Sequence, residues 1–268
     1  MCLILIAVET RPELPLFVAA NRDEYYKRPA EKAGFWKDSP QILGGKDMKA
    51  GGSWLGITRD GRIAAVTNFR DPSSKITNSP SRGMLVRDFL LGKDEPEDYL
   101  SGLEERADEF NGYNIVVGVR QRLFWYSNRG GPKRFLGPGI YGISNHLIDT
   151  PWPKVEKLKQ AFSRLLSKGA PIEKEVVFDL LHDRSTAEDS LLPDTGVELE
   201  WERALSAVFI ESPDYGTRSS TFLTLDAADN LEFTERSYNP RGRNGPDSHF
   251  ELALSQPGET PEEPRQFS

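Results

Sequence analysis

A lone cysteine stands at position 2, and a charged tetrapeptide, Asn21-Arg22-Asp23-Glu24, follows the second apolar run of the chain. A thiol that attacks a carbonyl carbon needs a base, a nearby cation and amide donors for the oxyanion. Removal of the initiator Met, which is favoured before a small side chain, leaves a thiol and a free α-amino group on Cys2. That amine has an ordinary pKa of about 7.7–8.0, so it can act as the base for its own thiol.

Further polar residues could complete such a catalyst. Asp23 is a carboxylate that could hold the ammonium, and Arg22 is a cation that favours thiolate. Asn68 and Asn145 stand at predicted strand ends, and either could donate to the oxyanion. Arg218 lies in a Thr-Arg-Ser-Ser-Thr run. Each feature also has a simpler interpretation: a buried thiol in a core strand, an ordinary charged turn, capped strand ends and a solvated strand edge.

Two short apolar segments must position the cysteine and the tetrapeptide. Residues 3–8 and 16–20 flank a turn-like stretch at 9–12, and this pattern predicts two buried strands joined as a hairpin. Antiparallel neighbours bring the start of one strand beside the end of the next. We therefore expect Cys2, Arg22 and Asp23 at the same sheet edge. Because side chains alternate along a strand, the adjoining Arg22 and Asp23 are expected to point to opposite faces.

The rest of the chain alternates between groups of strands and pairs of helices. Residues 25–40 are predicted to form a loop that partly covers the sheet, and Asp60-Gly61 predicts a tight hairpin turn. Ser81 and Thr150 are predicted N-caps, with Pro153 in the first turn of the later helix. Strands are predicted at 113–119, 122–127, 140–144, 207–210, 219–225 and 230–235, and helices after residues 81, 96, 150 and 171. This order favours an α+β fold with antiparallel sheets over a doubly wound parallel sheet.

Composition indicates a globular protein with a polar end. The chain has 268 residues, 37% of them hydrophobic, and a net charge of −7 without a Lys/Arg block, which argues against nucleic acid as a partner. One cysteine cannot form an internal disulfide, so a cytoplasmic location is expected. No apolar run is long enough to predict a membrane span. We expect a single domain over residues 1–238 and a polar, mobile tail over 239–268, with residues 250–254 docking locally.

Metal and nucleotide chemistry are not predicted. His146, His182 and His249 share no ligand spacing, and no Cys-x-x-Cys motif is present. His146 could be an axial ligand to haem, although a loop histidine is more often a capping or surface residue. The glycine-rich segment 44–56 lacks the Gly-Lys-Ser/Thr ending of a phosphate loop, so it is interpreted as backbone bends.

Taken together and in order, these motifs resemble the NRDE family, also called the transport and Golgi organisation protein 2 family. The resemblance runs from Met1 to about Tyr238. Its motifs are Met1-Cys2, Asn21-Arg22-Asp23-Glu24, Gly51-Gly52-Ser53-Trp54-Leu55-Gly56, Thr67-Asn68, Ser81-Arg82-Gly83, Ser144-Asn145, Asp149-Thr150-Pro151-Trp152-Pro153-Lys154 and Tyr215-Gly216-Thr217-Arg218-Ser219-Ser220-Thr221.

The resemblance implies a four-layer αββα fold of the N-terminal nucleophile hydrolase type, in which two antiparallel sheets lie between helix layers. A looser likeness to the cysteine-type bile-salt and penicillin acylases implies roles for individual residues. Catalytic roles then fall on Cys2, Arg22, Asp23, on Asn68 or Asn145, and on Arg218. Ligand contacts are expected from residues of the same motifs: Asn21, Glu24, Trp54, Trp152 and Thr217.

Two functions follow as hypotheses. The first is an N-terminal-cysteine amidohydrolase that cleaves the C–N bond of a linear amide through a thioester at Cys2 and requires no cofactor. The second is a non-catalytic carrier of haem or a lipid-like ligand, because the NRDE family has been linked to haem trafficking, lipid homeostasis and Golgi organisation. Both hypotheses predict a small-molecule partner, either an amide or an apolar ligand such as haem.

Overall fold

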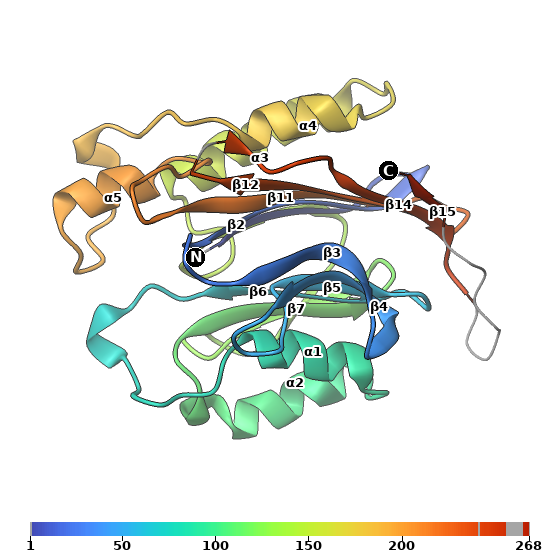
Figure 1. Ribbon diagram of the computed structural model, residues 1–268, viewed down its shortest axis with the longest axis horizontal. Coiled ribbons are helices and arrows are strands. Elements are labelled where there is room, and N and C mark those ends of the chain that lie inside the picture. Colours follow the sequence, from blue (N-terminus) through green and yellow to red (C-terminus); the bar gives the residue numbers. More distant parts are fainter. Residues whose placement is uncertain (1, 241, 256–264, 268) are drawn as a thin grey trace.

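The computed structural model describes residues 2–240, 242–255 and 265–267. Two antiparallel sheets lie face to face with helices over their outer faces, so the chain forms four layers (Figure 1). In spatial order, the first sheet contains β10 (Gly139–Ile143), β1 (Cys2–Arg11), β2 (Leu14–Tyr25), β11 (Tyr215–Leu225), β12 (Asn230–Asn239), β14 (Ser248–Ala253) and β15 (Arg265–Phe267), and β13 (Gly242–Arg243) pairs with β12.

The second sheet is built from the middle of the chain. In spatial order it contains β3 (Ala30–Trp36), β4 (Ser39–Asp47), β5 (Leu55–Thr58), β6 (Arg62–Asn68), β7 (Tyr113–Val119), β8 (Arg122–Ser127) and β9 (Arg134–Leu136). The α-helices are α1 (Gly83–Leu91), α2 (Pro96–Glu105), α3 (Pro153–Ser167), α4 (Lys174–Leu181) and α5 (Leu199–Leu205), and short 3-10 turns span Pro72–Ser74, Ala107–Glu109 and Asp189–Leu191.

Three apolar clusters fill the spaces between the four layers. Ile4, Ile6 and Val18 belong to the cluster between the sheets, whereas Leu3 and Phe17 pack under α3 and α4. A third cluster lies between the second sheet and helices α1 and α2. Because β1 and β2 are covered on both faces, they read as continuous apolar runs and not as alternating ones. The expected α+β fold with two antiparallel sheets is therefore confirmed.

The N-terminal hairpin has the predicted pairing. β1 and β2 are antiparallel, with Cys2 opposite Arg22 and Ile4 opposite Ala20. β11 lies on the other side of β2, and its register shifts between Thr217 and Ser219, opposite the charged end of β2. This central trio brings the first and last thirds of the chain together at the edge that holds Cys2.

Several local predictions are also confirmed. The Asp60-Gly61 turn joins β5 to β6, and Gly61 has a φ of +87°, which glycine adopts without strain. α1 ends at Gly92, and Pro96 and Pro153 open α2 and α3. The strands at 113–119 and 122–127 occur with the predicted bounds.

Other predictions are wrong. Residues 25–40 contain β3 and the start of β4, and β3 escaped prediction because an edge strand tolerates the polar sequence Ala30–Trp36. The expected strand at 207–210 is a buried connection, since its apolar side chains fill space beneath the helices and not a sheet position. The segment before it contains α5, which was not predicted from the sequence.

The two predicted N-caps are not used as caps. Arg82, and not Ser81, precedes α1, and Trp152, and not Thr150, precedes α3; neither helix start has a side-chain cap. The Thr150 hydroxyl donates instead to the carbonyl oxygen of Leu147 at 2.8 Å. Both helices therefore begin without the capping hydrogen bond that their sequences suggest.

Part of the expected tail belongs to the first sheet. Residues 248–253 form β14, which pairs with β12 along its length, and Phe250 and Leu254 are buried in the cluster between the sheets. Residues 241, 256–264 and 268, which the tail prediction also covers, lie outside the described residues. The division at residue 238 stays a prediction. In the described part of the chain, no helix is long and apolar enough to cross a membrane.

Candidate active site

The hairpin register decides which side chains meet Cys2. Residues directly opposite on antiparallel strands share a face, so Cys2 and Arg22 lie on the side of the sheet that faces the second sheet. Ile4 and Ala20, two positions further in, belong to the cluster between the sheets on that same side. Asp23 is one residue along and faces the helix side, as alternation predicts.

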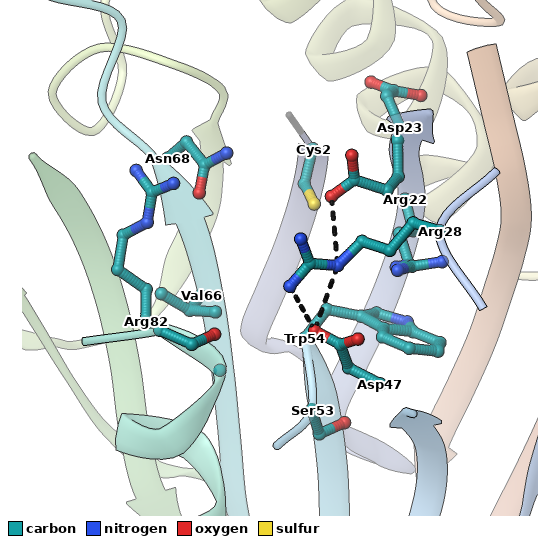
Figure 2. Close-up of a pocket in the computed structure, with 13 residues that line it drawn as sticks. Cys2, Arg22, Asp23, Arg28, Asp47, Ser53, Trp54, Val66, Asn68 and Arg82 are labelled. Carbon is teal, nitrogen blue, oxygen red and sulfur yellow. Dashed lines mark hydrogen bonds and ion pairs between the residues drawn. The ribbon is translucent and has the colours of Figure 1, made fainter. Parts of the chain in front are cut away.

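A cavity open to solvent lies at this edge between the two sheets. Figure 2 shows the Cys2 sulfur pointing into it from β1, with arginine side chains on both sides. The cavity is lined by Cys2, Arg22, Asp23, Glu24, Arg28, Asp47, Ser53, Trp54, Val66, Asn68, Ser81, Arg82 and Gly83. These residues come from both sheets and from the start of α1, so the site exists only in the folded chain.

Burial dominates the chemistry of the thiol. Cys2 is 9% exposed, and this burial raises the pKa of its thiol. The carboxylate of Asp23 raises that pKa further, whereas the guanidinium of Arg22 and a hydrogen bond with the Asp23 backbone lower it. At neutral pH the resting side chain is therefore the thiol, and a base must remove its proton before it can attack.

Arg22 is held flat against an aromatic ring. Its guanidinium carbon lies 4.0 Å from the ring centroid of Trp54, and the whole residue is only 6% exposed. The ring of Trp54 packs so closely on Gly45 that a Cβ there would lie 2.1 Å from it. Gly45, in the segment interpreted from the sequence as backbone bends, thus makes room for the ring that supports Arg22.

Arg28 forms the most complete ion pair of the cavity. Its guanidinium contacts Asp47 at 2.5 Å and Glu24 at 3.7 Å. The hydrogen bond with Asp47 raises the pKa of Arg28, against the effect of partial burial. Two carboxylates therefore neutralise this arginine. Sequence reasoning missed Arg28 and Asp47 because the first lies in the turn between β2 and β3, the second ends β4, and neither belongs to a recognised motif.

Asp23 sits in a buried polar group on the helix side. Its Oδ1 accepts a hydrogen bond from the Thr217 hydroxyl at 2.7 Å, and the residue is 1% exposed. Burial raises the pKa of the Asp23 carboxyl, and the ammonium of Lys154 most strongly opposes this. Burial also lowers the pKa of Lys154 to about 8. Thr217, expected to contact ligand, instead orients Asp23.

The two candidate asparagines have different places. Asn68 ends β6 and lines the cavity, on the wall that faces Cys2 in Figure 2. Asn145 is fully buried outside that lining, and its side-chain amide donates to the carbonyl oxygen of Asn68 at 2.9 Å. Of the two, Asn68 is therefore the one at the cavity, and the side chain of Asn145 fixes the Asn68 backbone.

Three other expected site residues do not reach the cavity. Arg218 lines a neighbouring cavity, where its Nη1 donates to the carbonyl oxygens of Tyr25 and Tyr26 at 3.0 and 3.2 Å. Asn21 points under the helices, and its amide donates to the carbonyl oxygens of Leu181 and Val208. Trp152 packs at the start of α3 in the cluster beneath the helices. Their sequence motifs thus build the fold around the site.

Seven residues that line the cavity were not predicted as site residues: Arg28, Asp47, Ser53, Val66, Ser81, Arg82 and Gly83. Arg28 and Asp47 had no signal, whereas Ser53 and Arg82 lie in motifs that were noted without a role. The Gly51-Gly52-Ser53 and Ser81-Arg82-Gly83 motifs are adjacent in the structure: a Cβ on Gly52 would lie 2.3 Å from the Gly83 backbone. Recognition that the two motifs pack together could have assigned them to the site.

One group of side chains has the spacing of a cation site. Ligand atoms of Glu232, His249 and Glu251 lie within 4.8 Å of one another on β12 and β14. Both ring nitrogens of His249 already take part in hydrogen bonds, with Thr234 and with Glu251. Glu232 meets His249 and Glu251 only through the pairing of β12 with β14, so no spacing in the sequence indicates the group. None of them lines the Cys2 cavity.

Two antiparallel sheets between helix layers, with a cysteine at the start of a central strand, define an N-terminal nucleophile hydrolase-like fold. A solved structure of the same fold is the Caenorhabditis elegans orthologue of N-acylethanolamine-hydrolyzing acid amidase. It aligns with a TM-score of 0.50 at 10% sequence identity, covering 83% of this chain and 92% of that chain. At this identity the similarity shows the fold alone.

The chain belongs to the Transport and Golgi organisation 2 family, whose model matches residues 1–240. The mouse Transport and Golgi organization 2 homolog is 35% identical over 257 residues, covering 88% of this chain and 93% of its own. The Drosophila melanogaster Transport and Golgi organization protein 2 is 26% identical over 261 residues, covering 88% and 92%. The family predicted from the sequence motifs is confirmed.

Proposed function

We propose that this protein is an N-terminal-cysteine amidohydrolase that cleaves a linear amide. The observation that carries the proposal is the position of the thiol: Cys2 opens a central strand opposite Arg22 and points into a cavity that Asn68 also lines. Asp23 is buried beside them. The similarity in fold to a structure named as an amidase is consistent with this chemistry.

The reaction begins when Met1 is removed. The α-amino group of Cys2 then accepts the thiol proton, and the thiolate attacks the carbonyl carbon of the amide. The side-chain amide of Asn68 donates to the resulting oxyanion. The ammonium returns its proton to the leaving nitrogen, the C–N bond breaks, and a thioester remains on Cys2. Water activated by the same amine hydrolyses the thioester and restores the thiol.

The charges around Cys2 support this sequence of steps. Burial raises the thiol pKa, so the base is needed in each cycle, and Arg22 stabilises the thiolate once it forms. Asp23 holds the α-ammonium, and its hydrogen bond with Thr217 fixes the carboxylate for that task. Arg218 is too firmly engaged with main-chain carbonyls in the neighbouring cavity to be assigned a catalytic step.

The carrier hypothesis has less support from the described residues. His146, the residue considered as an axial ligand of haem, makes a hydrogen bond of 2.8 Å with Thr150 and packs at a tilt against the rings of Phe69 and Trp152. It does not line the Cys2 cavity. The amidohydrolase proposal requires no cofactor. A cytoplasmic location is a separate proposal, based on the single free cysteine.

Hydrolysis of a panel of N-acyl amides tests the proposal. The parent protein is expected to release amine, and Cys2→Ala to release none, while Cys2→Ser keeps a weaker nucleophile and a reduced rate. Asp23→Asn is expected to lower kcat because the ammonium loses its partner. Intact mass must show a chain lighter by one methionine. Retained Met1 with no amide cleavage would overturn the proposal.

A further inference from the structure

Three arginines line the cavity beside Cys2, and its carboxylates form ion pairs with only one of them, Arg28. Arg28 pairs with Asp47 and Glu24, so those three charges are accounted for. Among the described residues, no carboxylate lies within ion-pair distance of Arg22 or Arg82, although both line the cavity. A buried cation without a counterion is costly, and it marks a place where a ligand can supply the missing charge.

Arg22 is fixed in place before any ligand arrives. Stacking on Trp54 holds the plane of the Arg22 guanidinium. Its nitrogens donate no hydrogen bond to any described residue. An arginine offers five N–H donors in a planar fork that matches a carboxylate or a phosphate. Little side-chain entropy is lost on binding, because the stack has already ordered the side chain.

Arg82 stands at the residue before α1, on the wall that faces Cys2 in Figure 2. Its Nη1 donates to the carbonyl oxygen of Gly112 at 2.9 Å, which holds the side chain and leaves its other donors available. The helix that follows has nine residues, no acidic side chain in its first turn and no side-chain cap. Its partial positive charge at the N-terminus therefore adds to that of Arg82.

We propose that the cavity binds an anionic group of the substrate between Arg22, on the side of Cys2, and Arg82 with the first turn of α1, on the facing wall; these groups are here called the arginine site. A carboxylate or a phosphate there would supply the negative charge that neither guanidinium receives from an ion pair with a described carboxylate, while the amide carbonyl reaches Cys2. The substrate class is then an acidic amide, such as an N-acyl amino acid. This rests on the proposed function only for the amide; the anion site itself depends on the cavity alone.

The negative groups near the arginine site do not fill this role. Glu24 and Asp47 are engaged with Arg28, and Asp23 faces the helix side with Thr217 and Lys154. Glu235 is buried in the neighbouring cavity, where its charge acts on Arg22, but among the described residues no ion pair joins the two. The Ser53 hydroxyl already donates to the carbonyl oxygens of Gly45 and Leu55, so Ser81 is the serine of the cavity lining whose hydroxyl can donate to an anion.

Paired alkylating reagents test the anion site without any amide substrate. Iodoacetate and iodoacetamide react with a thiolate in the same way: the sulfur–carbon bond forms, the carbon–iodine bond breaks and iodide leaves. They differ mainly in charge, so the ratio of their rates at Cys2 reports attraction of the anion and cancels the thiol pKa. The expected ratio in the parent protein exceeds that of free cysteine by roughly tenfold, the effect of one charge-assisted hydrogen bond.

Variants locate the effect. Arg82→Met is expected to reduce the ratio to near that of free cysteine, and Arg82→Lys to retain part of the increase, because it keeps the charge and loses the fork. Arg122→Met removes a charge that pairs with Glu95 and Glu97 on the surface, so it is the matched control and should change nothing. A parent ratio equal to that of free cysteine would overturn the inference, even if Arg82→Met fails to fold.

Competition distinguishes the two anion sources. Inorganic phosphate and acetate are each added during alkylation by iodoacetate, with chloride at equal ionic strength as the reference. Protection by phosphate at lower concentration indicates a phosphate group, and protection by acetate indicates a carboxylate. If neither anion protects Cys2 from iodoacetate more than chloride does, the proposed anion site is contradicted. Alkylation requires only the Cys2 thiol, so these results test the anion site whether or not the protein hydrolyses amides.

Discussion

Two buried arginines in this protein each stack on a tryptophan, with opposite consequences. Arg22 lies 4.0 Å over Trp54 at the Cys2 cavity, and Arg70 lies 4.8 Å over Trp152 beneath the helices. Arg70 has an ion pair with Glu202 at 2.6 Å, whereas no described carboxylate pairs with Arg22. The same stacking thus holds an arginine that has a carboxylate partner in one place, and an arginine that has no described carboxylate partner in the other.

The comparison separates stability from function. The carboxylate of Glu202 also accepts hydrogen bonds from the Thr195 backbone and hydroxyl, so the cluster around Arg70 ties α5 and its preceding loop to the rest of the fold. At the Cys2 cavity the polar groups converge on open space. Substitutions in the first region should therefore change the free energy of unfolding, and those in the second should change the reactivity of Cys2.

The largest effect is expected from Glu202→Ala. It leaves Arg70 buried without its counterion, and loss of one partner of a buried pair costs about 3–5 kcal/mol. Urea unfolding followed by circular dichroism measures the change. Glu97→Ala, which removes a partner from an exposed pair with Arg122, is the control and should leave the midpoint nearly unchanged. Equal urea unfolding midpoints for Glu202→Ala and Glu97→Ala would show that the buried Arg70 ion pair stabilises the fold no more than an exposed pair does.

The next effect depends on pH and on Lys154, which lies between the two regions. Its pKa falls from an ordinary value of 10.5 to about 8, so between these values the unfolded chain binds a proton that the folded chain does not. Stability from this group therefore rises with pH across that window, by about 3 kcal/mol in full. Lys154→Met should flatten the rise between pH 8 and 9.5.

The same two proteins supply the control for that measurement. Other groups that titrate nearby, including Cys2 and Tyr215, are common to the parent and the variant. Arg70, Glu202 and Asp23 also act on Lys154, and all three are common to the parent and the variant. The difference in slope between the two unfolding curves thus reports Lys154, and parallel curves would contradict its lowered pKa.

A smaller change in stability is expected from Arg22→Met. The variant removes a buried cation without a carboxylate partner and keeps much of the apolar contact with Trp54, so unfolding should shift by no more than about 1 kcal/mol. The thiolate of Cys2 loses a stabilising positive charge, so less thiolate is present at neutral pH and alkylation by neutral iodoacetamide should slow. A large loss of stability with unchanged alkylation of Cys2 would show that Arg22, like Arg70, stabilises the fold and does not act on the thiol.

Much of the site could be predicted because it depends on one hairpin. The continuous apolar runs before and after the turn at residues 9–12 indicated two buried strands, and antiparallel pairing alone brings Cys2 to Arg22. Alternation along β2 then sends Asp23 to the helix side. The motifs also supported the family, which the comparisons confirm across residues 1–240.

The remainder depends on contacts between distant segments. The cavity wall joins β4, the residues before β5, β6 and the start of α1, and sequence alone does not show how such pieces pack. β3 was missed because polar residues are tolerated at a sheet edge. The run at 207–210 was taken for a strand because its apolar side chains are buried under the helices, a burial that periodicity cannot assign to a sheet.

Direct observation of the thioester tests the central claim. The protein is mixed with an excess of an N-acyl amide, quenched in acid and measured by intact mass and peptide mapping. We expect a chain without Met1 that carries one acyl group on Cys2, and no adduct on Cys2→Ala. A chain that keeps Met1 and acquires no acyl group while it binds the amide would contradict the account and leave Cys2 as a buried residue at the start of a core strand.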